Sequence, residues 1–168
     1  MSARWKIALA RNRVMDVVLS SVIGQPSRTI TLKRIGSAYG GFWVPEFLLR
    51  ASTRGLVISA GIGFDVSFDR EMQHYGYRIV ALDPLPECAE YARQELKPEL
   101  ATVLQVGLWS SDGDLTFFAP RIPEHDSWSA VNIQETRTDL SKRFEVISLD
   151  SLLLAYPELN ASEPRILK

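Results

Sequence analysis

The hydrophobic pattern along the chain predicts alternating strands and helices. Short apolar, often β-branched runs at 56–60, 78–82 and 101–106 are typical of strands buried on both faces of a sheet. Segments 64–75 and 86–96 have helical spacing, and each follows one of these runs. Such alternation predicts an α/β fold with a parallel, doubly wound sheet and right-handed crossovers. Further predicted elements are strands at 115–119, 144–149 and 165–168, and a short helix at 150–154 capped by Asp150 or Ser151.

The N-terminal part has a different pattern. Residues 4–23 alternate basic and apolar groups, which indicates a helix. Either this helix contacts a membrane surface or a partner, or it packs on the domain with a solvated basic side, which we favour. We therefore divide the chain into a basic helical extension, 1–30, and a main domain, 31–168.

The start of that domain is rich in aromatic residues. The pattern predicts a strand at 29–35 and a helix at 45–51, with Pro45 in its first turn. Between them, Tyr39 belongs to a glycine-rich aromatic segment, 36–45. Two interpretations stay open: a flexible loop over a ligand, or a tight turn with its aromatic side chains in the core.

Size and composition limit the class of protein. A chain of 168 residues has room for one real core. Its formal net charge of −1 implies no general affinity for nucleic acid. We find no apolar run near the ~20 residues of a membrane span and no signal peptide. The lone Cys88 fits a reducing compartment, so we expect a cytoplasmic protein.

The segment 56–69 is typical of a nucleotide-binding turn, because a buried strand leads through Gly61 and Gly63 into a helix. The carboxyl ends of parallel strands meet in one crevice. Asp83 ends the next strand, twenty positions after Gly63, where an acid can accept hydrogen bonds from both ribose hydroxyls. We expect the same crevice to receive Ser59 from the first strand and Gly107 and Leu108 from the third.

The residues around the turn favour a positively charged cofactor. Val66 stands where the dinucleotide fingerprint requires its third glycine. Asp65 places a negative charge where a pyrophosphate would bind, unless it only complements the helix dipole. With Asp69, one predicted helical turn away, it would hold an ammonium group. S-adenosylmethionine, which is cationic and has no phosphate, is therefore favoured over NAD, and an NAD-dependent oxidoreductase is the weaker alternative.

These motifs resemble those of the FkbM-type methyltransferases, over roughly residues 33–168. The resemblance is fairly specific in the block from Asp65 to Asp69. The other matching segments are 34–36, 39–45, 59–64, 81–84, 106–109 and 113–117, with His125, Ser127, Ser129, Asn132 and Gln134 in the long loop.

The resemblance implies a Rossmann-like parallel sheet of the class I methyltransferase type, of which this chain would hold the first half. It also implies methyl transfer from S-adenosylmethionine to a hydroxyl of a sugar or natural product. Two departures matter: Ser59 replaces the acid that usually opens the glycine turn, and the sequence ends at Lys168, before the family's Asp-x-Glu-Gly segment. Whether the chain completes the reaction is therefore open.

The expected site has a cofactor part and an acceptor part. His125 is the candidate base for a small-molecule or glycan acceptor, although a surface-loop histidine is the commoner case. Ser129 and Asn132 are expected near the acceptor, and no histidine or cysteine cluster has metal spacing. The cofactor contacts that we expect are Tyr39, Ser59, Gly61, Gly63, Asp65, Asp69, Asp83, Gly107 and Leu108.

A second hypothesis needs no catalysis. If the strand at 165–168 is the last one, its outer edge is open to pairing with another chain. The protein would then be a cofactor- or partner-binding module that self-associates through this edge.

Overall fold

The structure, a computed structural model, describes residues 30–50, 55–122, 127–132, 140–157 and 165–168. Its contacts divide the chain into two units, Met1–Thr31 and Leu32–Lys168. The helix predicted at 4–23 lies outside the described residues. None of the helices within the described ranges is long and apolar enough to cross a membrane.

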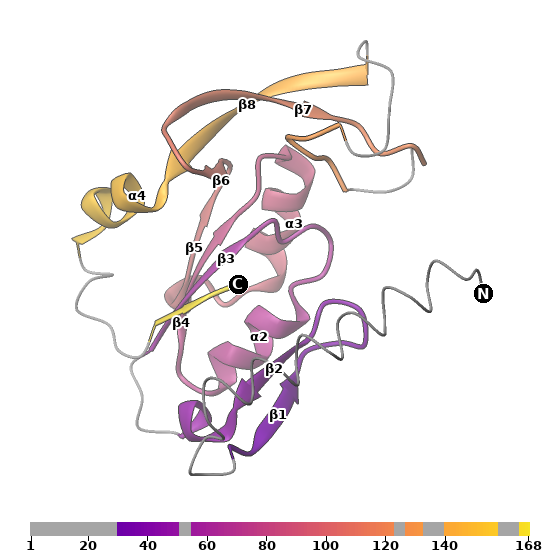
Figure 1. Cartoon of the computed structure of the whole chain (residues 1–168). Helices are drawn as coiled ribbons and strands as arrows, with labels where there is room; N and C mark the ends of the chain where they lie inside the picture. The colour runs from indigo at the N-terminus through magenta and orange to yellow at the C-terminus, as the bar shows by residue number, and fades with distance from the viewer. Residues whose placement is uncertain (1–29, 51–54, 123–126, 133–139, 158–164) are drawn as a thin grey trace, which may run out of the picture. The chain divides into compact units, whose positions relative to one another are not determined.

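A four-stranded parallel sheet forms the centre of the second unit (Figure 1). Its order is β5-β4-β3-β9, so the strands that follow β3 along the chain lie on both sides of it. This makes the unit an α/β fold with a parallel sheet, compatible with a Rossmann-like fold, as the alternating pattern predicts. The strands are β5 (Ala101–Leu104), β4 (Arg78–Leu82), β3 (Leu56–Ala60) and β9 (Arg165–Leu167).

Helices cover both faces of this sheet. One core cluster joins Val57 of β3 to Phe68 and Met72 of α2 (Ser67–His74). Ala92 of α3 (Pro86–Glu95) belongs to the same cluster. On the other face, Ile58 of β3 packs with Leu152 of α4 (Leu149–Ala155). Burial on both faces explains why the strands read as continuous apolar runs.

A hairpin precedes the sheet, where the sequence suggested a loop. β1 (Leu32–Ile35) pairs antiparallel with β2 (Phe42–Pro45), a strand that the pattern did not predict. The predicted helix at 45–51 is a short 3-10 helix, η1 (Glu46–Leu49). The hairpin turns Ile35 and Val44 into the core and leaves Trp43 exposed, so its aromatic residues are neither all buried nor all in a loop.

A separate three-stranded sheet has the order β6-β8-β7. β6 (Gly107–Trp109), which was not predicted, runs parallel to β8 (Ser141–Ser148), and β7 (Gly113–Phe118) runs antiparallel to β8. The predicted strands at 115–119 and 144–149 thus belong to this sheet, outside the parallel one. The Asp112 carboxylate accepts hydrogen bonds from Ser148 N and the Ser151 hydroxyl, which joins the turn before β7 to the start of α4.

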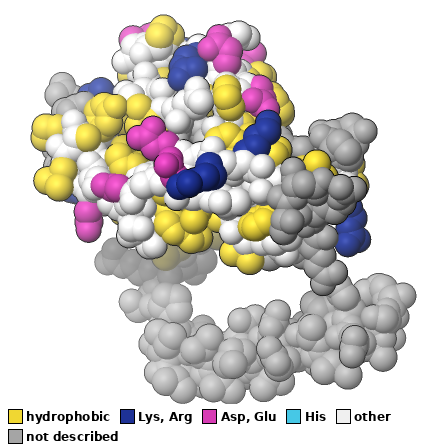
Figure 2. All heavy atoms as spheres, turned by 90° about the horizontal axis from the view of Figure 1, so that it is seen from above, with side chains coloured by type: hydrophobic (Ala, Val, Ile, Leu, Met, Phe, Trp, Pro, Cys, Tyr) yellow, Lys and Arg dark blue, Asp and Glu magenta, His cyan; other side chains and the backbone are white. Residues whose placement is uncertain are grey.

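The cap of α4 differs from the prediction. Ser148, and neither Asp150 nor Ser151, is the N-cap, and its hydroxyl accepts a hydrogen bond from Ser151 N at 3.1 Å. The helix therefore starts earlier than the apolar pattern indicates. Another short element is the 3-10 helix η2 (Pro98–Leu100) before β5. Seen from above, the described surface mixes hydrophobic, acidic and basic side chains (Figure 2).

Candidate functional site

A cleft of about 960 Å³ lies at the carboxyl ends of β3 and β4. The turn after β3 forms one part of its wall, and Phe117 of β7 and Trp128 form another. In an open α/β sheet, ligands bind at this end, near the strand at which the order reverses. That strand is β3 here, because β4 and β9 lie on opposite sides of it. The cleft is therefore the candidate site.

The glycine turn shapes the floor of the cleft. Gly61 and Gly63 have φ values of 69° and 55°, which L side chains rarely adopt. Gly61 N donates a hydrogen bond to Leu82 O at 2.9 Å, which fixes the turn to β4. A Cβ at Gly61 would meet no described atom within 4 Å, so this glycine is required by its backbone conformation, and its open side faces the cleft.

Asp83 lies at the end of β4 and lines the cleft, as predicted. Its Oδ2 accepts a hydrogen bond from Gly63 N at 2.9 Å, and its Oδ1 accepts one from Leu85 N at 3.0 Å. The turn and the acid are thus held together in the geometry that the spacing of Gly63 and Asp83 predicts.

Asp65 lines the cleft too, but its carboxylate already has partners. It accepts hydrogen bonds from the Ser37 hydroxyl at 2.5 Å, Ser67 N at 2.9 Å and Gly40 N at 3.1 Å. Burial alone would raise the pKa of Asp65, but these hydrogen bonds outweigh it and lower the pKa to about 2. Asp65 is therefore ionised at neutral pH, and it connects the β1–β2 loop to the start of α2.

The structure separates Asp69 and Ser59 from the cleft. Both side chains are fully buried, and neither residue is among those that line it. Asp69 instead forms an ion pair with Lys168. The expectation that Asp65 and Asp69 lie one helical turn apart is wrong, because α2 begins at Ser67 and Asp65 precedes the helix. Val66 is the N-cap of α2, and Ser67 N, at the start of the helix, donates a hydrogen bond to Asp65 Oδ1.

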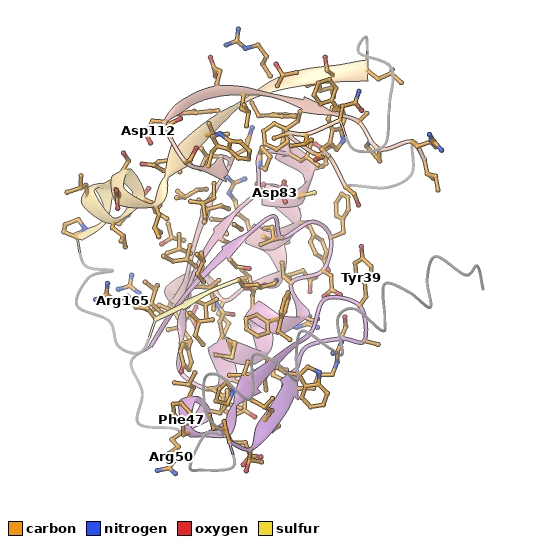
Figure 3. The ribbon with its side chains drawn as sticks, viewed as in Figure 1. Tyr39, Phe47, Arg50, Asp83, Asp112 and Arg165 are labelled. Atoms are coloured by element: carbon orange, nitrogen blue, oxygen red, sulfur yellow. The ribbon has the colours of Figure 1, made fainter. Side chains whose placement is uncertain are left out.

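Tyr39 projects from the β1–β2 loop toward the end of the sheet where Asp83 lies (Figure 3). It lines the cleft, and its side chain is 86% exposed. Its backbone N donates to the Ser37 hydroxyl oxygen, which itself donates to Asp65. Asp65 therefore positions the loop that carries Tyr39.

The predicted adenine-side residues, Gly107 and Leu108, both line the cleft from β6. The acceptor-side predictions fare differently. Ser129 is bridged to Phe118 of β7 by two backbone hydrogen bonds, and neither it nor Asn132 lines the cleft. The candidate base His125 lies outside the described residues.

Sequence reasoning missed the aromatic walls of the cleft. Phe64 packs edge-on against Tyr91 of α3, with ring centroids 5.7 Å apart, and both line the cleft. On another wall, Phe117 and Trp128 each pack edge-on against Phe144 of β8. In the sequence, Tyr91 differs in no way from any other helical residue, so nothing marks it as part of a site. Trp128 was detectable, because it is a large aromatic residue in a long loop, with no predicted strand or helix to bury it.

Neither metal-binding groups nor comparisons with known proteins identify what the cleft binds. Among the residues that the structure describes, no group of three or more His, Cys, Asp or Glu side chains is arranged to hold a metal ion. Comparisons of the chain with protein-family models, curated proteins and solved structures found no match. The structural evidence for a function is therefore confined to the residues of the cleft.

Proposed function

We propose that the cleft binds S-adenosylmethionine and that the protein is an S-adenosylmethionine-dependent methyltransferase. The observation that carries the proposal is the pair of cleft carboxylates, Asp83 at the end of β4 and Asp65 before α2. Asp83 would accept hydrogen bonds from the ribose hydroxyls, and Asp65 puts a negative charge where dinucleotide-binding proteins hold a pyrophosphate. The resemblance of residues 33–168 to FkbM-type methyltransferases supports the same cofactor.

The remaining cleft residues fit the parts of that cofactor. Gly107 and Leu108 offer backbone groups and an apolar side chain to an adenine ring. The open side of Gly61 lets a ligand approach the backbone closely. Asp65 has a pKa of about 2, so it keeps its charge for an ammonium or sulfonium group throughout the neutral range. Val66 takes the position of the third glycine of the dinucleotide fingerprint and is buried in the core, so the fingerprint is incomplete.

The reaction would need little covalent help from the protein. When bound, the cofactor supplies an electrophilic methyl group, and the chain must orient an acceptor hydroxyl in line with it and exclude water. Tyr39 and Trp128 lie on the rim and wall of the cleft and are suited to covering it. His125 remains the proposed base that removes the hydroxyl proton. The acceptor that we propose is a sugar or natural-product hydroxyl, since Phe117 and Trp128 offer apolar faces to such rings.

Calorimetric titration of the full chain with S-adenosylmethionine tests this function. We expect one site, and we expect Asp83→Asn to weaken binding roughly tenfold to a hundredfold, because hydrogen bonds to a charged group are worth about 1.5–3 kcal/mol. Asp114→Asn is the control, since Asp114 lies on β7 outside the cleft and pairs with Arg143 at the surface.

Several outcomes are distinguishable. A folded sample that binds NAD and not S-adenosylmethionine would refute the proposal in favour of the oxidoreductase. Equal losses in Asp83→Asn and Asp114→Asn would show that the cofactor does not use this cleft. Binding without methyl transfer to any hydroxyl acceptor would favour the non-catalytic binding module.

A further inference from the structure

A charged pair lies in the interior behind the glycine turn. Lys168 Nζ lies 3.1 Å from Asp69 Oδ2, and the two side chains are 9% and 0% exposed. Asp69 belongs to the first turn of α2, whereas Lys168 directly follows β9. Taking two charges out of water costs several kcal/mol per ion, so such a pair is rarely kept for stability alone. The contacts of the pair point to a second role.

Lys168 connects three elements at this point. Its backbone extends the pairing of β9 with β3, because Lys168 N donates to Ile58 O at 2.9 Å and Ala60 N donates to Lys168 O at 3.0 Å. Its ammonium group lies 5.5 Å from the ring centroid of Phe42 on β2 and 5.3 Å from that of Phe68 on α2. One side chain thus contacts the hairpin and the first helix, while its backbone holds the first strand.

The polar groups around the pair are only partly satisfied. Within the described part of the chain, neither Asp69 Oδ1 nor the Ser59 hydroxyl, both buried, has a hydrogen-bond partner. Ile58 pairs with Leu167, so Ser59 lies beside Lys168 in the next register position. This small polar region is specific to one alignment of the strands, since a hydrophobic neighbour in place of Lys168 would leave Asp69 as an unpaired buried charge.

We propose that Asp69 and Lys168 are positioning residues that fix the register of β9 against β3. A slip of β9 by one residue would turn Lys168 to the opposite face of the sheet, where Ile58 and Leu152 form an apolar cluster. In the observed register, Lys168 O accepts a hydrogen bond from Ala60 N, and Ala60, the last residue of β3, lines the cleft just before the glycine turn. The pair therefore sets the position of the glycine turn. The effect of this position on cofactor binding rests on the proposed function, whereas the register of β9 does not.

A double variant separates positioning from stability. Asp69→Leu or Lys168→Met alone leaves an unpaired buried charge, and we expect either variant to lower the unfolding midpoint. Asp69→Leu with Lys168→Met removes both charges, and we expect it to recover the midpoint. If the leucine does not fit, Asp69→Asn with Lys168→Met serves instead. The readout of register is amide hydrogen exchange at Ala60 and Lys168, measured by NMR, with Ile79 of β4 as the internal reference.

The proposal predicts that the double variant is stable but loses register. Protection of the Ala60 and Lys168 amides should fall at least roughly tenfold relative to Ile79, and affinity for S-adenosylmethionine should fall roughly tenfold. A double variant that keeps wild-type protection at Ala60 would overturn the positioning role. If the wild-type chain does not bind S-adenosylmethionine, the proposed function fails, while the exchange experiment still decides the register.

Discussion

Asp65 and Asp69 lie four positions apart, yet they belong to two different regions of the molecule. Asp65 lies on the rim of the cleft, where neutral hydroxyl and N–H donors hold its carboxylate. Asp69 lies in the interior, where the ammonium group of Lys168 balances its charge. On the rim, hydrogen bonds keep the Asp65 carboxylate charged near solvent. In the interior, the ion pair of Asp69 with Lys168 aligns β9 with β3.

The difference shows which carboxylate is available to a ligand. Asp65 and Asp83 line the cleft, although Asp83 is itself only 4% exposed, whereas Asp69 is fully buried and does not line it. We therefore propose ligand binding for Asp65 and Asp83, and a structural role for Asp69. The following predictions test this division, from the largest expected effect to the smallest.

Breaking the interior pair should have the largest effect. Lys168→Met leaves Asp69 buried without a counter-charge, and we expect a loss of about 3–5 kcal/mol in the free energy of unfolding, measured by urea denaturation. The matched control is Glu95→Gln, which breaks the exposed ion pair between Glu95 of α3 and Arg70 of α2 and should cost at most about 1 kcal/mol. Similar losses in the two variants would contradict the assignment of a buried pair.

Crowding the Asp65 carboxylate should have the next largest effect. A Cβ at Gly40 would lie 2.7 Å from the Asp65 carboxylate carbon, so Gly40→Ala should destabilise the protein by about 1–3 kcal/mol. In an Asp65→Ala background the clash is absent, and the same substitution should cost much less. An equal cost of Gly40→Ala in both backgrounds would show that Asp65 does not determine the packing of this loop.

The pH dependence of stability should reveal Asp65. Its pKa is lowered from 3.8 to about 2 in the folded protein, so its contribution is complete above the unfolded-state value. That contribution is lost as the pH falls from about 4 to about 2. Asp65→Asn should lack this part of the acid destabilisation, measured as the difference in urea midpoint between the two proteins at each pH. Parallel curves for the two proteins would count against the Asp65 network.

The smallest effect is expected far from the cleft. The pKa of Asp112 is lowered chiefly by the Ser151 hydroxyl and next by Ser148 N. Ser151→Ala should therefore raise the pKa of Asp112 toward 3.8 with little change in stability, followed by NMR titration of the carboxyl carbon. An unchanged Asp112 pKa would mean that this hydrogen bond does not persist in solution. Affinity for S-adenosylmethionine should not change, because neither residue lines the cleft.

Much of the sheet was predictable from local sequence. Strands β3 and β4 are where their apolar runs indicate, because burial on both faces demands a continuous run and the flanking residues end it. The positive φ of Gly76 after α2 likewise follows from its position as a helix-ending glycine. What failed depends on distant partners. Strand β6 is only three residues long and exists through pairing with β8, which lies far along the chain.

The candidate site was predictable only in part, for a similar reason. Asp83 and the glycine turn follow from spacing within one strand–turn–helix–strand unit, β3 to β4. The role of Asp69 depends on Lys168, which lies ninety-nine positions along the chain, and local sequence patterns do not reveal so distant a partner. The start of α2 was misplaced because Asp65 lies before the helix and accepts a hydrogen bond from Ser67 N, an interaction that apolar periodicity does not reveal.

An NMR titration of the full chain with S-adenosylmethionine tests the central claim most directly. We predict that saturable amide shifts concentrate at Gly61, Gly63 and Leu108, which line the cleft. The amides around Tyr156, in a second cavity beside α4, should not shift. A folded sample whose cleft amides do not shift at high cofactor concentration, or whose shifts cluster around Tyr156 instead, would contradict the account.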